Sequence, residues 1–120
     1  MASGAPDFGV YQKQYTSDGK VYTVGAAPTP TIYNVTMTDA NTEYSQALPT
    51  NCKKFTIQTR DGTGFRIAFV AGKVATPEEP YFTVPEYSTY NEDNLDLSNK
   101  TIYFACGSDG KVIELLAWSW

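Results

Sequence analysis

The chain has 120 residues, a length typical of one domain and sufficient to bury one hydrophobic core. Only 18% of its residues are charged and its net charge is −4, so it lacks the basic patch that nucleic-acid binding requires. No apolar run approaches the roughly 20 residues that span a bilayer, and residues 1–7 have neither the basic nor the apolar part of a secretory signal. We therefore expect one domain that binds neither nucleic acid nor a membrane.

Residues 1–30 differ in pattern from the rest of the chain. Phe8–Tyr15 and Val21–Val24 predict two short strands around a Ser-Asp-Gly-Lys turn. A Pro-rich connector, predicted to be extended, follows at residues 25–30. A two-stranded ribbon needs a surface to pack against, so this segment is either an edge hairpin of the same domain or an arm that docks onto a neighbouring subunit. We therefore divide the chain into an N-terminal arm or hairpin, residues 1–30, and a body, residues 31–120.

The first half of the body alternates apolar and polar residues with the period of two that is typical of half-buried strands. The predicted strands begin at Thr31 and then cover Thr42–Leu48, Lys53–Thr59 and Phe65–Val70. The inward stripes that this pattern predicts are Tyr33, Val35 and Met37, then Phe55, Ile57 and Thr59, then Phe65, Ile67 and Phe69. A Gly-containing turn at residues 60–64 predicts that the last two of these strands form a hairpin.

The second half of the body continues the same rhythm. Tyr81–Val84 predicts a short strand, and residues 86–97 predict a loop. Thr101–Cys106 and Lys111–Trp120 predict a final hairpin, whose second strand is apolar on both faces up to Leu116 and should therefore be central. The fold class that follows is all-β: a single antiparallel β-sandwich, either jelly-roll or Ig-like, with an extended N-terminal arm or hairpin.

Reaction chemistry finds little support in the sequence. The chain has no histidine, the commonest general base and the commonest metal ligand. Glycoside hydrolysis needs only two carboxylates, but the candidates lie in predicted loops, where a solvated surface is the simpler interpretation. These candidates are Glu78, Glu79, Glu86 and Glu92. We therefore expect no enzymatic activity and no cofactor.

An acidic run could bind calcium and the two cysteines could bind a metal or form a disulfide, but each feature has a simpler interpretation. Residues 91–96 supply the oxygens that calcium prefers, but they lack the glycine and the closing glutamate of an EF-hand, so we expect a turn in which Asn and Asp cap the backbone. Cys52 and Cys106 match no metal spacing. We expect two buried thiols there, with a disulfide as the alternative.

Aromatic residues, 14% of the chain, are the remaining candidates for a functional surface. Tyr and Trp are enriched at protein interfaces, and an exposed aromatic ring can also stack on a sugar. Trp118 and Trp120 lie two residues apart and so share one face of a strand. The candidate interface residues are Tyr11, Tyr15, Tyr81, Tyr87, Tyr90 and Trp120.

The body, residues 34–120, resembles a family of small virion structural proteins of tailed bacteriophages. The likeness is a pattern of strands and turns that covers about three-quarters of the chain and contains no catalytic signature. The segments that carry it are Asn41–Pro49, Lys53–Gln58, Arg66–Val70, Tyr81–Pro85, Leu95–Phe104 and Val112–Trp118.

The resemblance implies a non-enzymatic β-sandwich that is assembled into a particle in the cytoplasm of the bacterial host and resides in the virion. A head decoration (cement) protein is the first expectation, and a neck, tail or fibre component is the alternative. The implied partners are the major capsid protein or other virion proteins, and further copies of the chain itself as a homo-oligomer. A carbohydrate-binding adhesion module, which would use Trp120 and the loop tyrosines on a glycan, is the rival from another class.

Overall fold

The computed structural model describes residues 28–120, and the predicted strands of the arm, with Tyr11 and Tyr15, lie outside this range. All regular structure in the described residues is β-strand, which confirms the predicted fold class. Within residues 28–120 there is no helix long and apolar enough to cross a membrane. The strands are β1 (Thr29–Met37), β2 (Tyr44–Ala47), β3 (Cys52–Thr59), β4 (Phe65–Ala68), β5 (Phe82–Val84), β6 (Tyr90–Glu92), β7 (Thr101–Ala105) and β8 (Lys111–Ser119).

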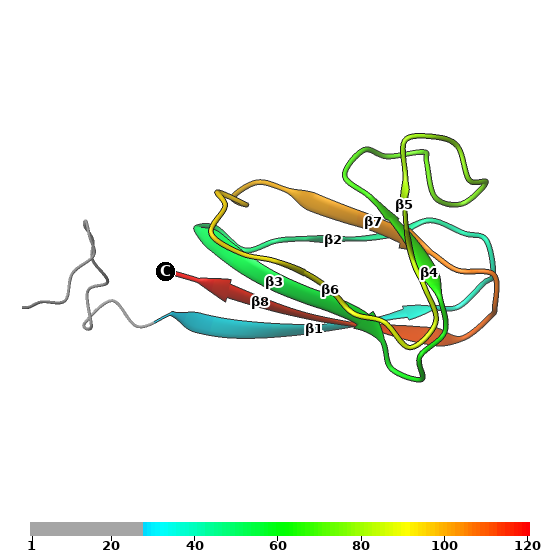
Figure 1. Ribbon diagram of the computed structural model, residues 1–120, viewed down its shortest axis with the longest axis horizontal. Coiled ribbons are helices and arrows are strands. Elements are labelled where there is room, and N and C mark those ends of the chain that lie inside the picture. Colours follow the sequence, from blue (N-terminus) through cyan, green and yellow to red (C-terminus); the bar gives the residue numbers. More distant parts are fainter. Residues whose placement is uncertain (1–27) are drawn as a thin grey trace, which may run out of the picture.

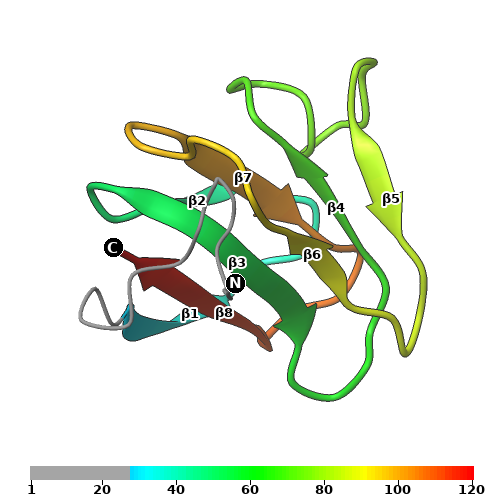
Figure 2. The ribbon, with the colours of Figure 1, turned by 60° about the vertical axis from the view of Figure 1, so that its left-hand side comes forward.

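The strands form two four-stranded antiparallel sheets with the orders β1-β8-β3-β6 and β2-β7-β4-β5 (Figures 1 and 2). The first strand pairs with the last, the second with the seventh, the third with the sixth and the fourth with the fifth. This pairing is that of a jelly roll, in which one long hairpin of four strand pairs is folded across two sheets. The topology therefore selects the jelly roll over the Ig-like alternative.

Both hairpins predicted for the body are wrong, because the two strands of each lie in opposite sheets. β3 pairs with β8 and β6, whereas the next strand, β4, pairs with β5 and β7. β7 and β8 are separated in the same way. Among the described strands, only β4 and β5 are neighbours both in the sequence and in a sheet. A Gly-containing turn reverses the chain, but it does not determine whether the next strand joins the same sheet or crosses to the other.

Two smaller predictions are also corrected. Residues 86–97, predicted to be a loop, contain the short strand β6. Phe69, predicted to point inward, is about half exposed because β4 ends at Ala68 and the chain bends there. Ala68 itself is buried on the outer side of its sheet, where the following loop places Val74 over it and over Ala105.

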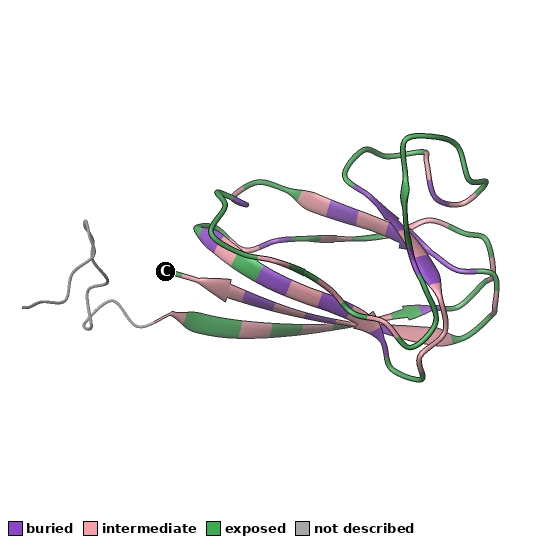
Figure 3. Ribbon diagram, viewed as in Figure 1, coloured by how far each residue is buried: buried purple, intermediate pink, exposed green. Residues whose placement is uncertain are grey.

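The main core lies between the sheets and is formed by the stripes that period two predicts. Phe55, Ile57 and Thr59 of β3 are buried, and the hydroxyl of Thr59 donates to the carbonyl of Thr63 at 2.6 Å. β8 is bonded to β1 on one edge and to β3 on the other, as predicted for a central strand. Its inward residues are fully buried: Ile113, Leu115 and Ala117. Figure 3 shows the alternation of buried and less buried residues along β3.

The corner between β3 and β4 depends on Gly62. This residue has a φ of +88°, which L side chains rarely adopt, and a Cβ built on it would lie 2.4 Å from the ring of Tyr87. The backbone N–H of Tyr87 donates to the carbonyl of Gly62 at 2.8 Å. The β3–β4 corner and the β5–β6 loop are therefore in direct contact, which is possible because position 62 has no side chain.

We predict that Gly62→Ala lowers the free energy of unfolding by about 1–3 kcal/mol, because it adds both backbone strain and a collision with Tyr87. Urea denaturation measures the loss. Gly72→Ala is the matched control: Gly72 has a similar φ of +87° but no atom within 4 Å of a new Cβ, so its cost is strain alone. Equal losses for the two variants would contradict the proposed contact, and in a Tyr87→Ala background the two losses should become equal.

Candidate interaction surfaces

An uncharged hollow lies where the edge strands β5 and β6 of the two sheets approach each other. We call it the aromatic hollow; its volume is about 360 Å³. It is lined by Ile67, Ala68, Phe69, Val70, Pro80, Tyr81, Phe82 and Tyr90. Two of the six predicted interface residues, Tyr81 and Tyr90, therefore meet here.

The rings of the hollow continue directly from the core. Phe55 is fully buried, and its ring centroid lies 5.9 Å from that of Tyr90 and 6.5 Å from that of Phe69. Phe82 packs on Tyr90 at 5.2 Å with the ring planes inclined by 56°. Tilted and edge-to-face contacts at these distances are favourable for aromatic pairs. Because buried Phe55 supports these rings from behind, their positions are set by the core.

The outer surface of the hollow is apolar and accessible. Val70 is 58% exposed, Phe82 54%, Phe69 46% and Tyr81 37%. Such a group of neighbouring exposed apolar side chains is typical of a protein–protein contact, whereas single exposed apolar residues are ordinary. The lining offers few hydrogen-bonding groups, which disfavours a sugar or a phosphate as its ligand.

Tyr90 contributes its ring to the hollow and directs its hydroxyl to Glu92. The hydroxyl donates to Oε2 of Glu92 at 2.5 Å. Burial raises the pKa of Tyr90 to about 12, and the hydrogen bond and negative charge of Glu92 act in the same direction. The hydroxyl therefore stays protonated at neutral pH, and its hydrogen bond to Glu92 fixes the ring as one wall of the hollow.

Trp120 lies in a second, more polar hollow at the other end of β3. We call it the terminal hollow; its volume is about 690 Å³, and it is lined by Lys53, Lys54, Asp93, Asn94, Leu95, Asp96 and Trp120. The backbone N–H of Trp120 donates to the carbonyl of Asn51 at 3.1 Å, which fixes the last residue against the β2–β3 turn. Half of the indole surface stays exposed beside charged and amide side chains.

Tyr87 belongs to neither hollow. Its side chain is 86% exposed and lies against the β3–β4 corner, with a φ of +59°. The predicted interface residues of the body are thus divided among three places. The structure brings together only Tyr81 and Tyr90.

The first two residues of the acidic run at 91–96 belong to β6, so the predicted turn is confirmed only for the bend that follows, where Asp96 caps the backbone. Asp96 accepts a hydrogen bond from the N–H of Ser98 at 3.1 Å, and hydrogen bonds from Ser98, with the charges of Lys53 and Lys100, lower its pKa. No group of three or more His, Cys, Asp or Glu side chains close enough to hold a metal ion occurs within residues 28–120. Cys52 and Cys106 are free thiols, and both are buried.

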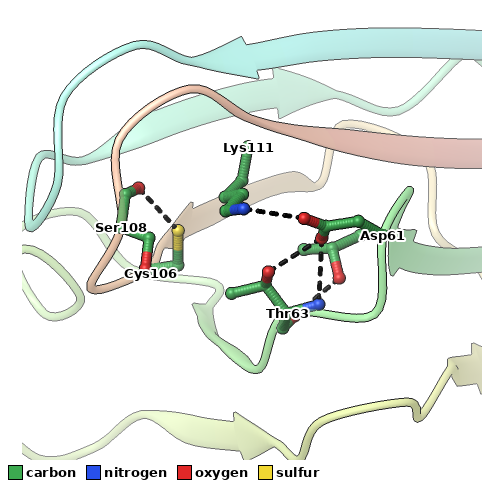
Figure 4. A network of polar contacts seen from close by, with 6 residues as sticks. Asp61, Thr63, Cys106, Ser108 and Lys111 are labelled. Atoms are coloured by element: carbon green, nitrogen blue, oxygen red, sulfur yellow. Dashed lines mark hydrogen bonds and ion pairs between the residues drawn. The ribbon is translucent and has the colours of Figure 1, made fainter.

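An ion pair between Lys111 and Asp61, together with hydrogen bonds from Thr63, connects the β3–β4 corner to the start of β8 (Figure 4). Nζ of Lys111 lies 2.8 Å from Oδ2 of Asp61, and Oδ1 of Asp61 accepts from the hydroxyl and the N–H of Thr63 at 2.8 and 3.1 Å. The hydrogen bonds from Lys111 and Thr63 lower the pKa of Asp61, while the Asp61 carboxylate raises the pKa of Lys111. Both shifts favour the charged forms at neutral pH, so the ion pair persists there and connects the corner to β8.

Sequence reasoning missed three of the exposed residues of the aromatic hollow: Phe69, Val70 and Phe82. The sequence signal that could have identified them is a pair of large apolar residues next to each other in the chain. In a strand of period two, neighbouring residues point to opposite faces, so in Phe69-Val70 and Tyr81-Phe82 one large apolar side chain of each pair must lie outside the core.

Comparison of the chain with protein-family models, with curated proteins and with solved structures gives no match. The resemblance to phage virion proteins stays a prediction from the sequence.

We predict that Asp61→Asn destabilises the protein at neutral pH and has little effect in acid. The pKa of Asp61 is lower in the folded state than its ordinary value of about 3.9, so the carboxylate stabilises the fold above that pH and loses this contribution as the pH falls below it. Lys111, whose pKa is raised, contributes below its ordinary value of about 10.4 and loses its part as the pH rises above it.

Urea denaturation of both proteins, at neutral pH and at the most acid pH at which the wild type stays folded, measures the difference, because the loss is complete only below the lowered pKa. Glu78→Gln is the control, since the carboxylate of Glu78 has no polar partner among the described residues. A difference between wild type and Asp61→Asn that is the same at both pH values would contradict the assigned role of the ion pair.

Proposed function

We propose that this chain is a non-enzymatic structural protein of a tailed-bacteriophage particle, and that it decorates the head by binding the major capsid protein. The sequence pattern of the body supports this proposal through its resemblance to small virion proteins. Jelly rolls also occur in viral capsid proteins and lectins, which is an analogy at the level of the fold. In a neck, tail or fibre protein the same contacts would be made to other virion components.

The observation that carries the proposal is the aromatic hollow. Its exposed rings are uncharged and held in place by Phe55 of the core, so they are ordered before a partner arrives. A preorganised surface loses little conformational entropy on binding. An apolar side chain of a capsid subunit that enters this hollow would bury Phe82 and Val70, the two most exposed of its large residues.

We predict that Phe82→Ser weakens binding of the full chain to phage heads by roughly 30-fold or more, as for a central interface residue worth at least about 2 kcal/mol. The heads are those of the phage whose genome encodes the chain, prepared without it, and binding is measured by co-sedimentation. Leu95→Ser is the matched control, because Leu95 is exposed to a similar degree but lies in the terminal hollow. Equal affinities of the two variants, or no binding of the wild type, would contradict the proposal.

The terminal hollow supports a second candidate, a carbohydrate-binding module. Trp120 offers an exposed ring beside two lysines, two aspartates and an asparagine, the mixture of stacking surface and hydrogen-bonding groups that a sugar needs. The loop tyrosines, expected to join it, lie elsewhere. A glycan array separates the candidates: binding by wild type that is lost in Trp120→Ala and kept in Tyr87→Ala would favour the module, and absence of binding would remove it.

A further inference from the structure

The two sheets have four edges, and three of them are protected against pairing with another strand. β6 and β5 are only three residues long and β2 only four. β6 ends in Glu92, next to Asp93; Pro80 and Pro85 lie on either side of β5; and Glu43 precedes β2. Short length, acidic residues and proline are the usual devices that keep a sheet edge from recruiting a further strand.

The fourth edge, β1, has almost none of these devices. It is nine residues long and contains no charged residue, and five of its residues are β-branched, which favours strand pairing. Pro30, near its start, removes one N–H donor from the ladder. β8 pairs with β1 along its whole length on one side. At the end of β1 the N–H of Gly110, just before β8, donates to Met37 and Thr38 on this same side. No backbone hydrogen bond from within residues 28–120 reaches the other side of β1.

An apolar row on the outer face of the sheet runs up to this edge. Ile32 of β1 is 68% exposed, and its cross-strand neighbour on β8 is Leu116, which is half-buried. Pro30 and Trp118 form the next pair along the same two strands. Figure 3 shows that most of β1 is exposed or only partly buried, unlike β3.

Two charges of this outer face, Arg60 and Glu114, are paired with each other away from the edge, and Lys54 of β3 lies beside Trp118, not on β1. Arg60 binds Glu114 at 2.8 Å, and Gln58 donates to the same carboxylate at 3.1 Å. Both interactions lower the pKa of Glu114. They join β3 and β8, so no charged side chain on β1 itself would meet an approaching strand.

We propose that β1 pairs edge to edge, antiparallel, with β1 of a second copy of this chain across a two-fold axis, so that the two β1-β8-β3-β6 sheets become one continuous sheet. A two-fold contact must be self-complementary, since each residue meets its own surface on the partner. β1 fulfils this condition because it has no charge to repel its copy, although the whole chain carries a net charge of −4. The Ile32 rows of the two copies then meet across the axis. This dimer does not depend on the proposed role in a phage particle.

The solution mass of the full chain tests the proposal. We predict that the wild type is a dimer by light scattering, and that the double variant Asn34→Lys/Thr36→Lys raises the dimer dissociation constant roughly tenfold or more, because like charges then face each other across the axis. Thr83→Lys is the matched control: Thr83 is also an exposed threonine on an edge strand, β5, and its variant should stay dimeric. Circular dichroism and the urea midpoint establish that the variants are folded.

Cysteine cross-linking supplies a second readout that a loss of folding would not imitate. Both native cysteines are buried, so a new surface thiol is the one that reacts. Under mild oxidation, one of the variants Ile32→Cys, Asn34→Cys and Thr36→Cys should form a disulfide-linked dimer with itself, or two neighbouring ones should cross-link when mixed. Thr83→Cys should give none.

Any of three results would overturn the proposal. A wild type that is monomeric at high concentration, with the thiol of Asn34→Cys accessible to a thiol reagent, would mean that the edge does not self-associate. A monomeric wild type in which that thiol is shielded would place residues 1–27 of the same chain on the edge. An oligomer that Thr83→Lys dissociates and the β1 variant does not would assign self-association to β5.

Discussion

The pairing of β8 with both of its neighbours is the interaction on which the rest of the sandwich depends. β8 is bonded along its length to β1 and β3, which both come from the first half of the body, and its inward residues form the middle of the core. Because nearly every strand partner is distant in sequence, the sandwich gains little stability from local hairpins. The corners must therefore be fixed individually, as Gly62 with Tyr87 and Asp61 with Lys111 do between β3 and β4.

The sequence predicts the elements of this fold far better than their partners. Period two identifies the buried residues of β3, because burial is a local property of a strand and its faces. The apolar run of β8 identifies its central position, although only its inward face is fully buried. Period two does not determine which strand lies beside which, since a turn at residues 60–64 has the same composition whether it closes a hairpin or crosses between sheets. Residue type alone makes Tyr81 and Tyr90 candidates for an interface. That Phe82 joins them in one hollow depends on how the two sheets meet at an edge, which the sequence does not determine.

The surface of residues 28–120 offers two features that suit contacts with other chains. The groups with shifted pKa values within residues 28–120 all take part in hydrogen bonds or ion pairs that fix a turn, a strand pair or one side of the aromatic hollow. They are Asp61, Tyr90, Asp96, Lys111 and Glu114. The aromatic hollow offers a preformed apolar surface, and β1 offers the backbone N–H and C=O groups of an edge strand that has no charged side chain. The two lie at opposite edges of the sandwich, since β1 bounds one side of its sheet and β6 the other. A partner bound at one of these edges would therefore leave the other edge accessible.

The central claim is that β1 is a sheet edge used for assembly, and hydrogen exchange followed over a range of protein concentrations tests it most directly. Amides of β8 are paired on both sides, so they should exchange slowly at every concentration. The amides of β1 that point away from β8 should become protected as the concentration of the full chain rises, because each dimer adds partners to them. Protection of β1 that does not change with concentration would contradict the account.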